Sequence, residues 1–365
     1  MKEREIKRLL LRHFQLYPKM QAVDAVKLLY QNAFGPGHIV SDESAVLKFL
    51  ESEFCKTESF DCDVAESIGN DYVRLSLAGI KKQYPPLSAK TLGRLIAETA
   101  NLPQSGKEYM RFRENIEVLY AFTEEGSAPF SVTELQIQLK TIDEGGLPPR
   151  HSEIYRDEYY PAYRIVTRDF ASFLPVFSEI DRVLHEKGRV LVGVDGRCTA
   201  GKSTLADELC AVYDAGVIHL DDFFLPSELR TSNRFDEPGG NVDYERFLFE
   251  VAHNLKANKQ FYYRVFDCSM MDFCLRKKEY TPKTVNIVEG SYSHRADFRD
   301  IYDLTVFLTV DKNEQRCRIE RRNGKEMAEQ FLSRWIPLEE KYFSFSSVEM
   351  NADIVIDTSG DIEES

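Results

Sequence analysis

One eight-residue segment constrains the fold of this chain more than any other: Gly196-Arg-Cys-Thr-Ala-Gly-Lys-Ser203. It fits the spacing G-x-x-x-x-G-K-S/T at every fixed position. The glycines let the backbone curl until successive N–H groups face one anion, and the N-terminus of a following helix favours negative charge. An apolar stretch, Arg189–Val194, precedes the segment and a helical stretch follows it. This context predicts a phosphate-binding loop (P-loop) at the edge of a sheet.

The C-terminal half alternates short β-branched stretches with helical ones. Five stretches are predicted strands: Arg189–Val194, Gly216–Leu220, Thr284–Val288, Leu304–Val310 and Asp353–Asp357. Strands that alternate with helices predict a parallel sheet with helices on both faces. We therefore expect an α/β domain over residues 166–365, in which residues 166–187 form a junction helix.

Residues 1–165 are predicted to form a mostly α-helical domain. Apolar residues recur at helical spacing from Ile6 to Phe14 and from Val23 to Phe34. Ser41 is placed to cap a third helix. Further helices are predicted at 88–100, 107–124 and 131–141.

The role of this helical domain stays open. A second ligand site is one interpretation of its basic and aromatic residues, chiefly His38, His151, Arg156 and Arg164. Residues of these types more often belong to the core and surface of a helical domain, which is the alternative.

Charge and cysteine content exclude several classes of function. A net charge of −13 argues against nucleic acid or an anionic membrane as the main partner, because both bind a positive surface. The seven cysteines show no C-x-x-C pair and no zinc-ligand spacing. The N-terminus is charged, and no apolar run approaches the roughly 20 residues that span a bilayer. We expect a cytoplasmic protein whose oligomeric state is open.

Carboxylates follow two of the predicted strands. Asp221 and Asp222 come directly after one apolar stretch, and Glu289 ends another, Val285–Val288. Ligands of an open parallel sheet collect beyond the carboxyl ends of its strands. No N-K-x-D motif occurs, so guanine recognition of the GTPase type is not supported. The carboxylates suit a kinase, which needs a base beside the acceptor hydroxyl.

Three arginines on one predicted helix form a candidate anion clamp. Arg318, Arg321 and Arg322 follow the strand Leu304–Val310 at spacings of three and four residues. Side chains at these spacings share one helix face and can converge on one anion. A solvated basic face is the alternative interpretation.

In their order along the chain, these segments resemble the uridine kinase and nicotinamide riboside kinase group. The resemblance covers about residues 188–358 and rests on Gly196–Thr204, Leu220–Phe224, Phe235–Pro238, Val288–Gly290 and Asn351–Ile356. It implies a P-loop kinase fold and an ATP-dependent, Mg²⁺-dependent kinase that phosphorylates an alcohol group of a small-molecule acceptor. The expected acceptor is a nucleoside or nucleoside-like compound. A nucleotide-binding regulatory protein, whose P-loop domain controls the helical domain without a metabolite acceptor, is the alternative.

The resemblance also implies roles for single residues. Asp221 is the expected general base and, with Ser203 and Glu289, a ligand of Mg²⁺. Lys202 and the three arginines Arg318, Arg321 and Arg322 are expected to stabilise the transferred phosphate. The residues expected to bind ATP are Gly196, Arg197, Cys198, Thr199, Ala200, Gly201, Lys202, Ser203 and Thr204. Those expected to contact the acceptor are Asp222, Phe224, Asp236, Phe266 and Asp267, with Asp236 on sugar hydroxyls.

One segment departs from the pattern of the group. Where the uridine kinases carry Tyr-Asp-Phe-x-x-His, this chain has Phe266-Asp-Cys-Ser-Met-Met271. Phe266 and Met271 lack the hydroxyl and the imidazole that would bond a pyrimidine. An unpaired polar edge costs about 1–3 kcal/mol per group in a dry pocket. We therefore expect uridine and cytidine to be poor acceptors compared with the true one.

Overall fold

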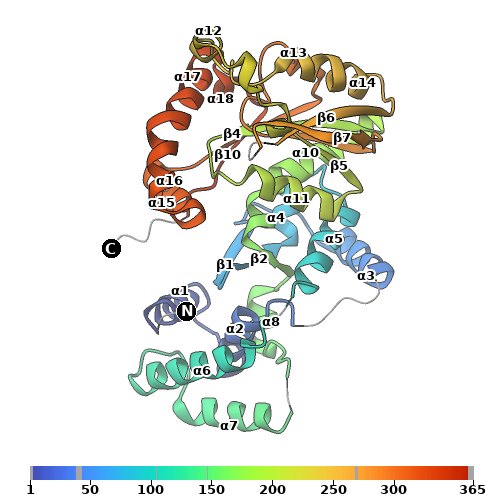
Figure 1. The fold of residues 1–365 in the computed structure, drawn as a ribbon. Helices are drawn as coiled ribbons and strands as arrows, with labels where there is room; N and C mark the ends of the chain where they lie inside the picture. The colour runs from blue at the N-terminus through green and yellow to red at the C-terminus, as the bar shows by residue number, and fades with distance from the viewer. Residues whose placement is uncertain (1–2, 38–42, 104, 146, 268–269, 361–365) are drawn as a thin grey trace. The chain divides into compact units, whose positions relative to one another are not determined.

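The structure is a computed structural model that describes residues 3–37, 43–103, 105–145, 147–267 and 270–360 (Figure 1). The chain divides into two compact units, Met1–Leu174 and Pro175–Ser365. The first unit ends at Leu174 and not at residue 165, where the sequence analysis placed the boundary. A strand that runs from Tyr163 to Thr167 and a short helix that ends at Ser172 complete it. No described helix is long and apolar enough to cross a membrane.

The N-terminal unit is mostly helical, as predicted. Its helices are α1 (Glu3–Leu16), α2 (Ala22–Phe34), α3 (Glu43–Lys56), α4 (Leu77–Gln83), α5 (Ala89–Ala100), α6 (Glu108–Glu124), α7 (Val132–Asp143), α8 (Glu153–Tyr159) and α9 (Arg168–Ser172). The apolar faces of α1, α2 and α6 meet in one core, in which Leu10, Leu29 and Leu119 are completely buried. Burial of each such leucine stabilises the unit by about 1.5–3 kcal/mol.

This unit also holds a small antiparallel sheet that the sequence analysis did not predict. Its strands are β1 (Ala65–Gly69), β2 (Tyr72–Ser76) and β3 (Tyr163–Thr167), in the order β1-β2-β3. β2 pairs with β3 across a long stretch of intervening helices. Pairing between segments so far apart in the chain leaves no local periodicity from which to predict it.

The C-terminal unit is the predicted α/β domain. Its helices are α10 (Leu174–Lys187), α11 (Lys202–Val212), α12 (Ser232–Asp236), α13 (Tyr244–Phe247), α14 (His253–Lys256), α15 (Lys312–Asn323), α16 (Lys325–Gln330), α17 (Ile336–Ser346) and α18 (Val348–Asn351). The 3₁₀ turns η1 (Leu220–Phe223), η2 (Ser227–Leu229) and η4 (Arg299–Ile301), and the π-helical turns η3 (Leu248–Ala252) and η5 (Phe331–Trp335), complete the helical segments. The helix predicted for residues 166–187 is two helices, α9 and α10.

All five predicted strands are confirmed, and they form one parallel sheet. They are β4 (Val190–Gly196), β5 (Ala215–His219), β8 (Val285–Glu289), β9 (Leu304–Thr309) and β10 (Ile354–Asp357). The order across the sheet is β10-β9-β4-β8-β5. Register pairs Glu289 with both Val194 and His219. The ends of β4, β5 and β8 therefore lie level, so the segments that follow them meet at one edge.

Both faces of the sheet are covered. Leu191 and Phe307 belong to a core shared with η3, α14 and α17, whereas Val192 and Val306, which point to the opposite face, are equally buried. In Figure 1, α10 and α11 lie on one side of the sheet, and α13 and α14 on the other. A hairpin of β6 (Phe261–Asp267) and β7 (Asp272–Tyr280) adds a separate two-stranded sheet that was not predicted.

Candidate active site

The P-loop turns sharply at the end of β4. Gly196 has a φ of +144°, and a Cβ at this position would lie 2.1 Å from the carbonyl oxygen of Leu308 on β9. That carbonyl accepts a hydrogen bond from the N–H of Arg197 at 3.0 Å. Only glycine fits so close to a neighbouring strand. The loop then reaches Gly201, and α11 begins at Lys202.

Lys202 lies along the inside of this loop. Its Nζ donates to the carbonyl oxygens of Gly196 at 2.7 Å and Arg197 at 3.0 Å. An ammonium group has three protons, so one proton remains for a phosphate oxygen. The N-terminus of α11 adds a partial positive charge at the same place. The loop geometry therefore suits a bound triphosphate.

Two carboxylates lie beside the loop, as the strand register requires. The hydroxyl of Ser203 donates to Oε2 of Glu289 at 3.4 Å, and Nδ1 of His219 lies 2.6 Å from Oε1 of the same glutamate. That bond to Glu289 raises the pKa of His219. Asp221 stands in the first turn of η1, exposed to the cavity yet surrounded by protein. This enclosure raises the pKa of Asp221, and the charge of Glu289 raises it further.

The donor set fits magnesium. Ser203, Asp221 and Glu289 offer one hydroxyl and two carboxylates, which are oxygen ligands of the kind that Mg²⁺ takes together with substrate phosphates. In the described ranges, no group of three or more histidine, cysteine, aspartate or glutamate side chains is arranged to hold a metal ion by itself.

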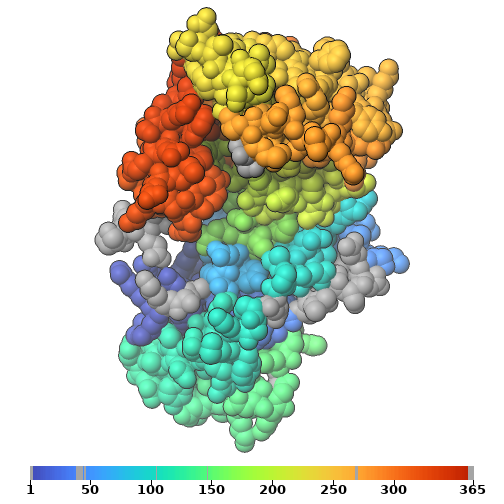
Figure 2. Space-filling model, in the orientation of Figure 1, coloured from blue at the N-terminus to red at the C-terminus, as the bar shows by residue number. Residues whose placement is uncertain are grey.

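These groups line one cavity of about 740 Å³. Figure 2 shows the surface hollowed between the red segment with α15–α17 and the orange segment with β6 and β7. Among the predicted site residues, those on its wall are Cys198, Thr199, Gly201, Lys202, Ser203, Thr204, Asp221, Phe224, Glu289, Arg318, Arg321 and Arg322. The wall also holds residues to which the sequence analysis gave no role at the site, among them Arg230, Phe235, Asn241, Tyr292, Trp335 and Glu339.

The three arginines of α15 differ in how they are held. The guanidinium of Arg318 donates to the carbonyl oxygens of Thr199 at 3.2 Å and Thr358 at 2.6 Å, and to Glu314 at 2.9 Å. Arg322 lies against the thiol of Cys198 at 3.7 Å. Arg321 is exposed on the cavity wall, with no hydrogen bond or ion pair to any described residue. Arg318 therefore ties the P-loop to the end of β10, whereas Arg321 can turn toward a ligand.

Several predicted site residues lie away from the cavity wall. Asp222 accepts a hydrogen bond from Tyr263 at 3.1 Å. Asp236 is exposed, and its backbone carbonyl accepts a hydrogen bond from Lys341 at 2.6 Å.

The predicted residues of the β6–β7 hairpin also lie off the wall. Phe266 is buried against Phe273, with ring centroids 5.9 Å apart. Asp267 accepts a bond from the N–H of Met270 at 3.4 Å. The remaining P-loop residues off the wall are Gly196, Arg197 and Ala200, of which Arg197 pairs with Glu340.

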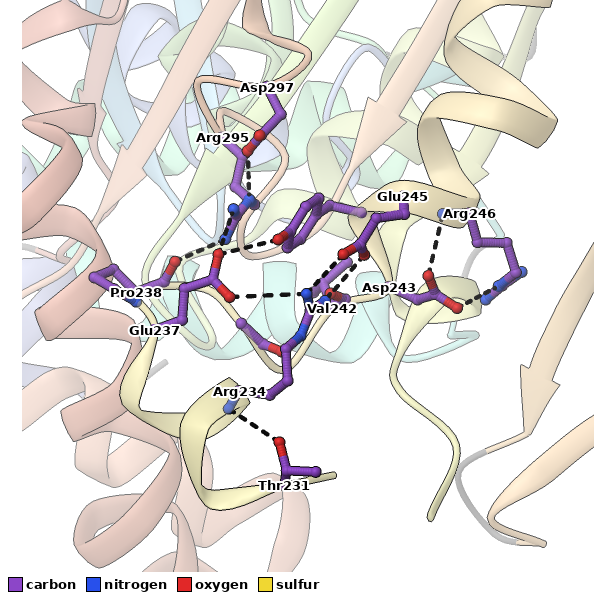
Figure 3. Close-up of polar contacts among 12 residues, drawn as sticks. Thr231, Arg234, Glu237, Pro238, Val242, Asp243, Glu245, Arg246, Arg295 and Asp297 are labelled. Carbon is purple, nitrogen blue, oxygen red and sulfur yellow. Dashed lines mark hydrogen bonds and ion pairs between the residues drawn. The ribbon is translucent and has the colours of Figure 1, made fainter. Parts of the chain in front are cut away.

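Arginines fix the segment between α12 and α13 (Figure 3), and Asn241 of this segment lines the cavity. Arg234 donates to the carbonyl oxygens of Gly240 at 3.1 Å and Val242 at 2.9 Å. Arg295 donates to the carbonyl oxygen of Pro238 at 2.7 Å and stacks over the ring of Tyr244. A loop whose carbonyls are bonded this way holds its side chains in fixed positions.

Sequence reasoning missed one buried group that organises the site. Asp195, completely buried, accepts hydrogen bonds from the N–H groups of Gly196, Tyr292 and His294 and from the hydroxyl of Tyr342. Its place directly before the P-loop was the available signal. Its hydrogen bonds join the end of β4 to the loop after β8.

Two of the residues considered for a second site in the N-terminal unit are held by contacts within that unit. His151 bonds to Asp24 at 2.9 Å and to the hydroxyl of Tyr163 at 2.6 Å, which anchors the start of α8. Arg164 pairs with Glu53, and Arg156 is exposed. His38 lies outside the described residues.

No family model matches the chain. It is 27% identical to uridine-cytidine kinase D of Dictyostelium discoideum over 120 residues, which are 33% of this chain and 23% of that protein. The chain thus spans less than a quarter of the length of this relative.

Two solved structures also show a likeness. A possible uridine kinase from Bacillus stearothermophilus is 21% identical, with a TM-score of 0.39, over 50% of this chain and 100% of the other. A candidate fructose transport system kinase from Silicibacter is 23% identical, with a TM-score of 0.37, over 46% of this chain and 89% of the other. The P-loop, the five-stranded parallel sheet and the sequence match together make the C-terminal unit similar to the uridine-kinase-like P-loop kinases.

Proposed function

We propose that the C-terminal unit transfers the terminal phosphate of ATP to a hydroxyl of a small metabolite, a nucleoside or a nucleoside-like sugar. The observation that carries this proposal is the meeting of a P-loop with Asp221 and Glu289 on one cavity wall. A protein that only binds a nucleotide needs no carboxylate on the acceptor side of the phosphates. The relative named above is a uridine–cytidine kinase, which supports the same class of reaction.

Each group has a definite task in this reaction. Asp221 accepts the proton of the attacking hydroxyl, and its raised pKa makes it a better base than an exposed aspartate. Lys202 and Arg321 offset the charge that spreads over the transferred phosphate. Ser203 and Glu289 would hold Mg²⁺, which supplies further positive charge at the phosphates.

The acceptor side of the cavity is partly apolar. Phe224, Phe235, Met271 and Trp335 lie on its wall. These side chains can hold a planar or aliphatic group by contact but cannot bond to the polar edge of a pyrimidine. They support an acceptor other than uridine or cytidine.

A phosphotransfer screen tests the proposal. The full chain is mixed with ATP and Mg²⁺ and with each of a panel of nucleosides, sugars and vitamins, and ADP release is measured. We expect ADP to form only with particular acceptors, and each of these to gain a phosphate by mass spectrometry. Tight nucleotide binding without transfer to any acceptor would favour the regulatory alternative.

A further inference from the structure

Three buried polar side chains line the cavity and have no role yet in the proposed reaction. They are Asn241, Tyr292 and Glu339, with 8%, 2% and 9% of their surface exposed. All three lie on the cavity wall, whereas Asp236, expected to hold sugar hydroxyls, does not. Buried polar groups are costly unless they are bonded, so their unused bonding capacity indicates what the cavity binds.

The carboxylate of Glu339 can accept more hydrogen bonds than the protein supplies. It projects from α17, and its Oε1 accepts from the hydroxyl of Ser291 at 2.7 Å. Its Oε2 accepts from the N–H of Cys198 at 3.2 Å. A carboxylate accepts about four hydrogen bonds, so roughly two remain. Since the side chain lines the cavity, the partner that fits there is a donor on the acceptor molecule.

Tyr292 offers the complementary donor. Its buried side chain lines the same cavity as Asn241. A tyrosine hydroxyl carries one proton that it can donate to a ligand. Burial holds the pKa of Tyr292 above its ordinary value, so the proton stays in place.

The backbone holds Tyr292 and Asn241 in position. Tyr292 has a φ of +77°, which a bulky residue rarely adopts. Its N–H bonds to Asp195 at 3.2 Å, and its ring packs on Tyr342 with centroids 5.0 Å apart. The carbonyls on either side of Asn241 both accept from Arg234 (Figure 3). The strained φ of Tyr292 persists only because the surrounding contacts impose it.

We propose that Tyr292 and Glu339 bind the hydroxyl groups of the acceptor, an inference that rests on the proposed function. Tyr292 donates a hydrogen bond and Glu339 accepts one, which is the pairing that a hydroxyl, itself both donor and acceptor, requires. The acceptor therefore carries at least one hydroxyl besides the one that is phosphorylated, as a ribose does and a simple alcohol does not.

The test compares two conservative variants with a matched control. Tyr292→Phe and Glu339→Gln each remove one bonding feature and keep the shape of the side chain. Tyr280→Phe is the control, because it removes a buried hydroxyl of the same unit, which bonds to Asn286 at 3.0 Å, and Tyr280 does not line the cavity. The probes are ribonucleosides with their 2′-deoxy and 3′-deoxy counterparts. Acceptor KM, kcat and ADP affinity are measured, with folding checked by the fluorescence of Trp335.

We expect Tyr292→Phe and Glu339→Gln to raise the KM of a ribonucleoside about tenfold or more, with ADP affinity within a few-fold of the parent. One deoxy counterpart should be a poor acceptor of the parent, and the variants should affect it little, since the bond is already missing. Tyr280→Phe should leave KM unchanged.

Two results would overturn the assignment while leaving the kinase proposal intact. One is a parent-like KM in both variants. The other is a loss of ADP affinity in Glu339→Gln without a change in KM, which would mean that Glu339 only supports the P-loop. If Glu339→Gln does not fold, Tyr292→Phe decides alone. A parent that transfers phosphate to no acceptor would instead refute the proposed function.

Discussion

Replacing Gly196 with alanine tests the P-loop geometry most sharply. The new Cβ would lie 2.1 Å from the carbonyl oxygen of Leu308 at a φ of +144°. To relieve this overlap, the loop and the Leu308 carbonyl must move apart by about 1 Å, because non-bonded atoms attract only at larger separations. The shift also breaks the bond from Arg197 to that carbonyl, worth about 0.5–1.5 kcal/mol. With backbone strain of about 1–3 kcal/mol, we expect a loss of roughly 2–4 kcal/mol of stability.

Gly188→Ala provides the matched control. Gly188 also has a positive φ, +73°, but a Cβ there would meet nothing within 4 Å. Its substitution should cost only the conformational strain, about 1–2 kcal/mol. Gly188 precedes β4 and Gly196 ends it, in the same unit. The difference between the two variants therefore reports the contact with Leu308 together with the greater strain of a φ of +144°.

The assay uses the single tryptophan of the chain. Trp335 lies on the cavity wall, so its fluorescence reports both unfolding of the C-terminal unit and nucleotide binding. Urea midpoints and ADP affinities are measured for the parent and both variants. A 1 Å displacement in a catalytic site can lower the rate about 10²-fold. The same displacement misaligns the N–H groups that face the phosphates, so Gly196→Ala should bind ADP more weakly than Gly188→Ala. Equal midpoints and equal affinities in the two variants would refute this reasoning.

Three further predictions follow from the contacts. Lys202→Ala should abolish phosphate transfer and weaken ATP binding, measured by the rate of ADP release and by titration; near-parent activity would contradict the site. Arg321→Ala should lower kcat without altering the urea midpoint, whereas Arg318→Ala should lower the midpoint, because it leaves the Thr358 carbonyl unpaired. Burial lowers the pKa of His13 to about 4. Below its unfolded pKa, near 6.5, the unfolded state gains protons, so stability falls as pH drops: by about 2 kcal/mol between pH 7 and pH 5, measured by circular dichroism. His13→Gln should remove this dependence.

The parallel sheet, the P-loop and the nearby carboxylates could be predicted, because each is marked by a short continuous segment of the sequence. Each strand of the parallel sheet is a short apolar run, and the P-loop motif marks the edge to which the strands point. Asp221 and Glu289 then meet because they follow strands that end level. In the N-terminal unit, amphipathic periodicity predicted the long helices for the same reason.

The acceptor wall could not be predicted, because its contacts join distant segments. Glu339 reaches the N–H of Cys198 across 141 positions, and no motif surrounds it. From their spacing alone, Arg318, Arg321 and Arg322 were all predicted to bind the same anion. In the structure, Arg318 donates a hydrogen bond to the carbonyl of Thr358, which follows β10. Such distinctions appear only when the packing of the whole unit is known.

The central claim is that Asp221 activates a hydroxyl for attack on the terminal phosphate of ATP. The most direct test follows the labelled γ-phosphate of ATP in the parent and in Asp221→Asn, with an active acceptor present. We predict that the parent moves the label to the acceptor, and that Asp221→Asn does so about 10²–10⁴-fold more slowly while binding ATP within a few-fold of the parent. Transfer by Asp221→Asn at the rate of the parent, or label released only as inorganic phosphate whether or not an acceptor is present, would contradict it.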